Sequence, residues 1–359
     1  MVTKLVTVMV VGLLAAVQPM GCSLITVKAG DECPVCDTLF TELETTATGE
    51  RIRVVNQQER GEPKSGTALM FYWASSAIFR ACDYLKYHFG EESCDTQMVR
   101  NDKSNGEHGN RTVVLNFEPS RGQETARCPC TNVHRVQIVL FSFGKHSLPV
   151  DSNCAWSHPN GISAMKLCQS PEGYPVEGYQ DLWRCMYEAS CPIIDNRHQL
   201  AILRDPRAMT VSAYYFALVH GISAFQDMSF EEFILESLPS MTQWVGIRYI
   251  LFEGLMANRS TVLYYEEMLA DPVGFHYDYL HSVGLQLPFE VVEDMADAAD
   301  RGDFPFKGIK GIDPHPGGAN ATSSRSFKDE VTEEMLEMMN DVVRIWLPPA
   351  LLARFGIAP

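Results

Sequence analysis

The residues best suited to chemistry in this chain stand together in the segment Pro63-Lys-Ser-Gly-Thr67. Lys64 supplies a mobile positive charge, and Ser65 and Thr67 can donate hydroxyl hydrogen bonds. Gly66 has no Cβ, so the backbone can approach an anion closely. An apolar run follows, which predicts a helix whose positive amino end would complete a phosphate site.

The spacing of this segment differs from that of nucleotide triphosphatases. Their pattern is Gly-x-x-x-x-Gly-Lys-Ser/Thr, whereas here the loop is shorter and Lys64 precedes Gly66. This argues against an ordinary ATPase or GTPase.

A second anion-binding pattern follows the short apolar run Gln199–Leu203, which predicts a strand. Arg204 stands at the strand end, Pro206 suits the first turn of a helix, and Ser212 lies eight residues after Arg204. An arginine at the strand end and a hydroxyl two turns into the helix could hold one phosphate. The alternative is that Arg204 simply pairs with a neighbouring aspartate.

Catalytic groups are expected after a third strand, Val136–Ser142, because open α/β sheets place such groups beyond the carboxyl ends of strands. Lys145 and His146 stand there. A loop histidine without a role is the alternative interpretation of His146.

These segments must be positioned by a central sheet flanked by helices. We expect the core to begin near Ile52 with a strand, followed by the Lys64 loop and a helix over 69–87 that stops at Gly90. Further strands are expected at 112–117 and 261–264, and further helices at 208–220, 229–238, 241–256, 273–283, 288–300 and 331–350.

Length and charge narrow the class of protein. The chain has 359 residues, 29 Lys plus Arg, 45 Asp plus Glu and a formal charge of −16. One large α/β domain over 52–359 is therefore expected. So acidic a surface disfavours nucleic acid as a partner.

The amino terminus reads as a targeting segment. Lys4 precedes an apolar run from Leu5 to Val17, and small residues follow up to Ser23, so we expect a signal peptide over 1–23 or a short anchor. No later stretch reads as a membrane span. Residues 24–51 are predicted to be a polar lead-in. The predicted location is the secretory lumen, including the Golgi, or outside the cell.

Cysteine usage agrees with an oxidising compartment. Removing Cys22 with the signal peptide would leave ten of the eleven cysteines, an even number that suits disulfides. The close pairs Cys82/Cys94 and Cys185/Cys191 are plausible bridges. Zinc is the competing interpretation of the Cys33-Pro-Val-Cys36 and Cys128-Pro-Cys130 patterns, but no further ligands stand at finger-like spacing. Three sequons, at Asn110, Asn258 and Asn320, suit a glycoprotein.

Three stretches lack a strong periodic pattern. Insertions are predicted around 91–130 and 150–195, where turn residues and cysteines accumulate. A Gly- and Pro-rich mobile loop is predicted over 302–324 and ends at Arg325.

Taken in order and spacing, the Pro63–Thr67 loop, the Arg204 to Ser212 stretch, Tyr265-Glu-Glu and the Arg325 segment resemble the PAPS-dependent sulfotransferase family, PAPS being 3'-phosphoadenosine 5'-phosphosulfate. The resemblance implies a P-loop NTPase-like sulfotransferase architecture with a mostly parallel sheet of about five strands, and a lumenal member with cysteine-rich insertions.

The resemblance also implies roles for individual residues. The loop from Lys64 to Ala68, which includes Ser65, Gly66 and Thr67, would hold the 5'-phosphosulfate, with Lys64 near the bridging oxygen. Arg204, Ser212 and Arg325 would bind the 3'-phosphate, and Tyr265 would approach the adenine. Cytosolic members place a lysine and a histidine where Lys145 and His146 stand, which implies that His146 is the general base and that Lys145 assists at the sulfonate oxygens. His134 and Glu118 are the alternatives to His146, because many lumenal members use a glutamate.

The implied reaction is in-line transfer of a sulfonyl group to a hydroxyl or amine of an acceptor, which could be a glycan, a peptide or a small alcohol or phenol. No metal is required.

The chain departs from the cytosolic pattern in three places. Ala68 and Leu69 replace a threonine and an adenine-stacking tryptophan, 140 residues separate Lys64 from Arg204, and Arg325 is followed by Ser326 rather than by Lys-Gly. The competing functions are a catalytically silent nucleotide-binding protein and a kinase-like phosphoryl transferase. The latter would need a Ser/Thr directly after Gly-Lys.

Overall fold

A computed structural model describes residues 41–61, 64–101, 110–118, 135–142, 148–149, 177–188, 193–195, 197–219, 221–222, 228–306 and 327–358. All of these residues belong to the unit Cys33–Pro359.

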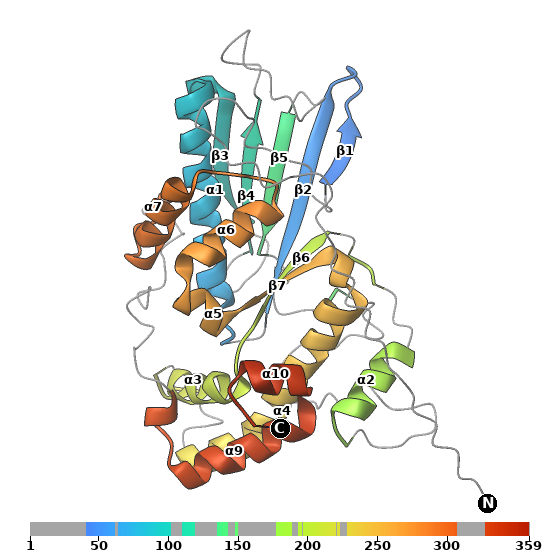
Figure 1. The fold of residues 1–359 in the computed structure, drawn as a ribbon, viewed down its shortest axis with the longest axis vertical. Helices are drawn as coiled ribbons and strands as arrows, with labels where there is room; N and C mark the ends of the chain where they lie inside the picture. The colour runs from blue at the N-terminus through green and yellow to red at the C-terminus, as the bar shows by residue number, and fades with distance from the viewer. Residues whose placement is uncertain are drawn as a thin grey trace, which may run out of the picture. The chain divides into compact units, whose positions relative to one another are not determined.

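A seven-stranded sheet forms the centre of this unit (Figure 1). Strand β2 (Arg51–Arg60) is parallel to β5 (Arg135–Phe141) on one side and to β6 (His198–Leu203) on the other. Strand β7 (Ser260–Tyr264) extends the parallel part beyond β6. The predicted α/β class with a central, mostly parallel sheet and flanking helices is confirmed, and the sheet has seven strands rather than about five.

Antiparallel strands complete the sheet at its margins. Strands β3 (Cys94–Asn101) and β4 (Asn110–Phe117) continue from β5, and β1 (Thr41–Thr45) pairs with the first half of β2. Strand β4 agrees with the sequence prediction, but β1 lies inside the expected lead-in and β3 inside the expected insertion at 91–130. Both are polar in sequence, because an edge strand buries little of its surface and shows a weak hydrophobic pattern.

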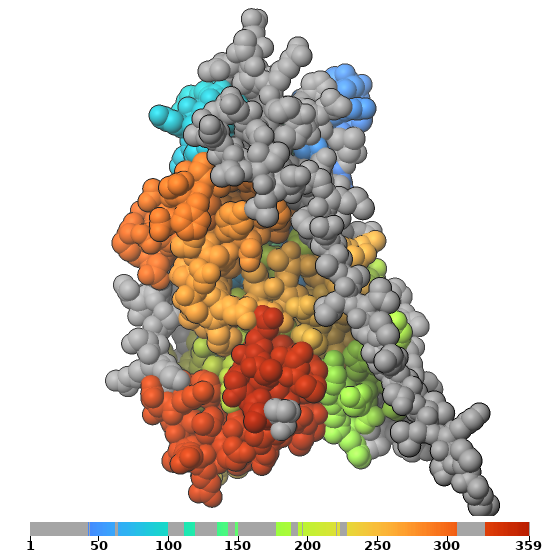
Figure 2. Space-filling view, viewed as in Figure 1, coloured from blue at the N-terminus to red at the C-terminus, as the bar shows by residue number. Residues whose placement is uncertain are grey.

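Both faces of the sheet are covered, as the residues of β6 show. Leu200 and Ile202 join the core beneath α1 (Thr67–Phe89), whereas Ala201 and Leu203 point into cores on the opposite face. A parallel strand buried on both faces reads as a continuous apolar run, which is why the sequence predicts β6. Figure 2 shows α6 and α7 in orange and α9 and α10 in red on the face seen there.

Helix α1 has the predicted position and ends at Gly90, whose φ of 99° suits glycine at a helix end. Trp73, Ile78 and Leu85 lie on its buried side. A disulfide between Cys82 and Cys94 joins α1 to the start of β3, which confirms one of the two predicted pairs. Cys185 is also disulfide-bonded, and the predicted partner Cys191 lies outside the described residues.

One long helix, α4 (Phe230–Tyr249), stands where the sequence predicts two. It begins at a capping box between Ser229 and Glu232 and contains Pro239. Proline disfavours a helix interior, but Leu238 and Thr242 are buried on either side of it, so tertiary packing overrides the local preference. The helix continues as a π-helical segment over Ile250–Leu255.

The other helices agree with the predicted pattern except for α2, α5 and α10, which the sequence pattern does not predict; the final helix expected over 331–350 ends at Trp346, and α10 follows it as a separate helix. No described helix is long and apolar enough to cross a membrane. The remaining bounds are α2 Tyr179–Glu188, α3 Pro206–Val219, α5 Tyr265–Ala270, α6 Pro272–Ser282, α7 Phe289–Asp300, α9 Glu333–Trp346 and α10 Pro349–Arg354, with single turns at Glu91–Ser93, Ala257–Arg259 and Phe327–Asp329.

Candidate functional site

The predicted strand–loop–helix unit is formed by β2, the residues around Lys64 and α1. Residues Glu62 and Pro63 lie outside the described residues. Gly61 lets the loop pack closely on the strand end, because a Cβ there would lie 2.2 Å from Thr67 Cγ2 and 2.6 Å from Ser65 Oγ. Ser65 and Thr67 are accordingly buried.

The loop backbone has an uncommon conformation that a neighbouring arginine supports. Lys64 has a φ of 70°, a left-handed value that costs a non-glycine residue about 1 kcal/mol or more. Arg204 follows β6 and donates a hydrogen bond from Nη1 to the carbonyl oxygen of Lys64 at 2.7 Å. The arginine at the end of one parallel strand therefore holds the loop that follows its neighbour.

Tyr265 packs against the same loop from the start of α5. A Cβ built on Gly66 would lie 2.2 Å from Tyr265 Cδ2, and the φ of Gly66 is 95°. The guanidinium carbon of Arg204 lies 4.1 Å from the centroid of the Tyr265 ring. Gly66, Arg204 and Tyr265, which are far apart in the sequence, therefore form one contact group.

The Lys64 side chain extends toward α3. Its Nζ lies 3.1 Å from the centroid of the Phe216 ring. Ser212 lies one turn before Phe216 on the same face of α3, which directs that face toward the loop. Burial and, to a smaller extent, the charge of Arg204 lower the pKa of Lys64 to about 8.

The positive groups at this site are not neutralised by the acidic residues that the structure describes. Neither Lys64 nor Arg204 forms an ion pair with any described residue. Arg204 Nε is buried and lacks a hydrogen-bond partner within the part of the chain that the structure describes. A buried donor left unsatisfied costs about 1 to 3 kcal/mol, so an accepting ligand or water fits there.

Helix α1 adds its amino end to the same site. Among the described residues no side chain caps this end, and the first turn contains no acidic residue. Free N–H groups and the helix dipole favour an anion at such a position. With the two cations Lys64 and Arg204, the arrangement fits a ligand that carries negative charge at more than one place.

Acidic residues beside Arg204 hold the start of α3. The backbone N–H of Asp205 donates to Glu266 Oε1 at 3.1 Å, and the carboxylate of Asp205 pairs with Arg207 at 2.6 Å. The protein packed around Glu266 and the negative charge of Asp205 raise the pKa of the Glu266 carboxyl to about 7, although the side chain keeps contact with solvent. Glu266 therefore changes its charge close to Arg204 near neutral pH.

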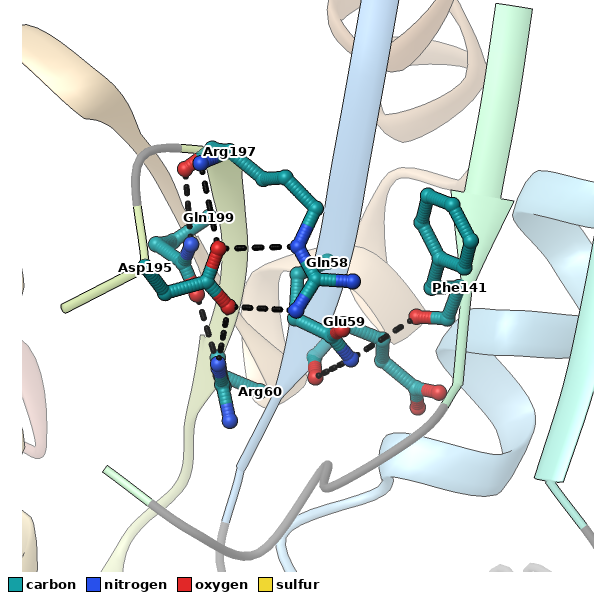
Figure 3. Close-up of polar contacts among 7 residues, drawn as sticks. All are labelled: Gln58, Glu59, Arg60, Phe141, Asp195, Arg197 and Gln199. Atoms are coloured by element: carbon teal, nitrogen blue, oxygen red, sulfur yellow. Dashed lines mark hydrogen bonds and ion pairs between the residues drawn. The ribbon is translucent and has the colours of Figure 1, made fainter. Parts of the chain in front are cut away.

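A buried polar network supports the base of the loop (Figure 3). Arg60, the last residue of β2, donates to Gln199 Oε1 and to Asp195 Oδ2, each at 2.7 Å. Arg197 pairs with the same Asp195 at 2.6 Å. The hydrogen bonds and charges of these arginines lower the pKa of Asp195 although burial opposes the shift. The network ties the carboxyl end of β2 to the amino end of β6.

The structure brings together most of the predicted anion-binding residues. Lys64, Gly66, Arg204 and Tyr265 are in contact with one another through the pairs given above. Ser65, Thr67 and Ala68 lie in the same loop or the first turn of α1, and Ser212 lies on the facing side of α3.

The predicted catalytic residues Lys145 and His146 lie outside the described residues, as do His134 and Arg325. Glu118, the alternative base, lies at the wrong end of the sheet. It follows β4 and pairs with Arg135, the first residue of β5, at 2.9 Å. The length of β2, about 30 Å at the usual rise for its ten residues, separates that end from the Lys64 loop.

Sequence reasoning missed three members of the site: Gly61, Phe216 and Glu266. Gly61 directly follows the strand, and Phe216 stands four residues after Ser212, so both had a positional signal. Glu266 stands in the Tyr265-Glu-Glu segment, but only the fold places it beside Asp205. No group of His, Cys, Asp and Glu in the described residues could hold a metal ion.

Fold and site together define an α/β protein with a candidate anion-binding loop between β2 and α1. A scan against protein-family models and a search of curated proteins give no match. Among solved structures, the chain is similar to retinol dehydratase in complex with androsterone and the inactive cofactor PAP, with a TM-score of 0.35, 11% identity and coverage of 85% of this chain and 90% of that chain. A likeness of this size carries no argument about function, which must rest on the site.

Proposed function

We propose that this protein is a PAPS-dependent sulfotransferase that moves a sulfonyl group to a hydroxyl or amine of an acceptor. The observation that carries the proposal is the meeting of Lys64 and Arg204, two cations that follow neighbouring parallel strands and form no ion pair among the described residues. PAPS has negative charge at both its 5'-phosphosulfate and its 3'-phosphate, so it needs cations on two sides of one loop.

The residues present fit such a ligand. The buried Arg204 Nε lacks a partner among the described residues, and the amino end of α1 is uncapped by any of them, so donors are available at two places. Each charge-assisted hydrogen bond to such an anion contributes about 1.5 to 3 kcal/mol.

The chain's own residues then have distinct roles in the proposal. Lys64, with the Ser65 to Ala68 backbone, binds the 5' end and neutralises charge on the leaving phosphate. Arg204 and Ser212 bind the 3'-phosphate, and Arg325 adds to them. His146 accepts the acceptor's proton, and Lys145 assists at the sulfonate oxygens. When bound, PAPS supplies an activated sulfonyl group and leaves as PAP.

The contact of Tyr265 with adenine stays a prediction. Its ring is 7% exposed and packs against Gly66 and Arg204, which favours bracing of the loop as its first role. Another aromatic residue would then stack on the base, since Leu69 stands in place of the tryptophan.

A secretory location and a lumenal acceptor belong to the same proposal. The Cys82–Cys94 disulfide supports an oxidising compartment such as the Golgi lumen. Glycans and secreted peptides are the acceptors that such a location favours, with small alcohols and phenols as the other class.

Calorimetric titration of the purified protein with PAP tests the proposal. We expect saturable binding that is weakened about tenfold or more in Lys64→Ala, the loss expected for a charge-assisted contact. Lys86→Ala is the matched control, because Lys86 lies at the other end of α1 and pairs with Glu91 on the surface. Equal weakening in both variants, or no binding in the wild type, would reject the Lys64 assignment.

A further inference from the structure

The ammonium of Lys64 rests on an aromatic ring that the proposed reaction does not use. Lys64 Nζ lies 3.1 Å from the centroid of the Phe216 ring, a position in which a cation is attracted by the negative face of the ring. The lysine comes from the β2–α1 loop and the phenylalanine from the third turn of α3. The contact therefore joins the two elements that flank the candidate site.

The ring is the attractive partner of this ammonium among the described residues. The hydrogen bond at Lys64 uses its carbonyl oxygen, not its side chain, and the other nearby charge is the like charge of Arg204. Half-burial removes part of the water that would otherwise solvate the ammonium. A weakly solvated cation beside a second cation is stabilised by a ring face, and an anion stabilises it more strongly.

The left-handed backbone of Lys64 sets the direction of the side chain. Because Arg204 holds the Lys64 carbonyl at 2.7 Å, the loop stays in place while the four-carbon side chain can turn between partners. The backbone from Ser65 to Ala68, which would hold the 5' end of the ligand, directly follows Lys64, so that end would lie within reach of a turning lysine.

We propose that Phe216 is a positioning residue that holds the Lys64 ammonium in the free protein and releases it to the anionic ligand. This inference rests on the proposed function and adds a residue and a binding step to it. The ligand must displace the ring, so the contact lowers the affinity for the ligand while it keeps the site ordered before binding. Phe216→Leu removes the ring but keeps an apolar side chain, so this variant should bind the anionic ligand more tightly.

Nuclear magnetic resonance of the full chain with ¹³C-dimethylated lysines tests this step. A methyl group above a ring face gives an upfield-shifted signal, and Lys64→Ala identifies it by its loss. We expect this signal in the free protein and in Phe216→Tyr, which keeps the ring, but not in Phe216→Leu. Saturation with PAP should return it to the ordinary lysine position.

Calorimetry with the same variants measures the energetic consequence. Phe216→Leu should bind PAP about twofold to thirtyfold more tightly than the wild type, the range that a cation–π contact spans. Weaker binding by Phe216→Leu, a shifted signal that persists at saturation, or no shifted signal in the free protein would overturn the inference. If the shifted signal is present and PAP does not bind at all, the proposed function fails instead.

Discussion

Arg204 Nη1 donates to the carbonyl oxygen of Lys64 at 2.7 Å, although 140 positions separate the two residues in the chain. The bond fixes the loop after β2 to the residue that directly follows β6. Two cations that the sequence presents as separate motifs thus belong to one site, and the parallel pairing of Arg60 with Ala201 brings them together.

Replacement of Arg204 should damage binding more than folding. Arg204→Ala removes the bond to Lys64 and a positive charge, so we expect PAP affinity to fall about tenfold to a hundredfold. Arg354→Ala is the matched control. The guanidinium carbon of Arg354 lies 3.7 Å from the ring centroid of Tyr264, the residue before Tyr265, and Arg354 pairs with Glu267 on the surface. Titration calorimetry compares the two, and a similar loss in both would count against a specific role for Arg204.

Glu266 should make stability depend on pH near neutrality. Its folded pKa, about 7, lies above the ordinary 4.5, so the folded protein holds a proton that the unfolded chain has released. The free energy of unfolding of the wild type therefore falls as pH rises from 4.5 through 7. Glu266→Gln keeps an oxygen that can accept from the Asp205 N–H. Because its amide does not titrate, the stability of this variant should not fall in this way.

Urea unfolding at pH 5 and pH 8 measures that difference. The control is Glu267→Gln, since Glu267 is the next residue of α5, is exposed like Glu266, and pairs with Arg354 rather than accepting from the Asp205 N–H. From pH 5 to pH 8 we expect the free energy of unfolding of Glu266→Gln to rise relative to that of the wild type. The free energy of unfolding of Glu267→Gln should change in parallel with that of the wild type. If the stability of Glu266→Gln changes in parallel with that of the wild type, the pKa of the wild-type Glu266 carboxyl is not raised by folding.

The close contact of Gly66 with Tyr265 predicts a strong effect of a single methyl group. Gly66→Ala adds a Cβ at 2.2 Å from the Tyr265 ring and places alanine at a φ of 95°. Gly302→Ala carries the backbone penalty alone, because Gly302 has a φ of 68° and its added Cβ would meet no described atom within 4 Å. We expect a cost of about 1 kcal/mol for Gly302→Ala and a larger one for Gly66→Ala in urea unfolding. Equal losses of stability in the two variants would contradict the close contact between Gly66 and Tyr265.

The Cys82–Cys94 bridge should contribute measurably to stability. It closes a loop of 12 residues between α1 and β3, and removing a disulfide of this kind costs about 2 to 4 kcal/mol. The double variant Cys82→Ala/Cys94→Ala should show this loss in urea unfolding. A loss below about 1 kcal/mol would mean that packing of α1 on the sheet holds the two ends together without the bridge.

The sequence is informative where one segment buries a continuous apolar surface. Strands β5 and β6 and helix α1 are predictable because their apolar residues face cores on known periods, whereas β2 is apolar only in its first half and buries the polar residues from Gln57 to Arg60. Strand β3 escapes prediction because it pairs only with β4 and is mostly polar. Pro239 divides the predicted α4 in two, since a local rule for proline cannot include the packing of Leu238 and Thr242.

The site is predictable as a set of residues but not as a set of contacts. Residue types and spacing point to Lys64, Arg204 and Ser212, because phosphate-binding chemistry limits which side chains can serve. The partners Phe216 and Glu266 are ordinary residues whose position depends on how α3 and α5 pack. Glu118 suits the chemistry of a base, yet strand direction places it at the other end of the sheet.

The central claim is that the protein binds one ligand at both of its anionic ends. The preference for PAP over adenosine 5'-phosphate tests this claim most directly. The two ligands differ only in the 3'-phosphate. We predict that the wild type binds PAP at least about tenfold more tightly and that Arg204→Ala and Ser212→Ala lose most of this preference. Equal affinity of the wild type for both ligands would contradict the account.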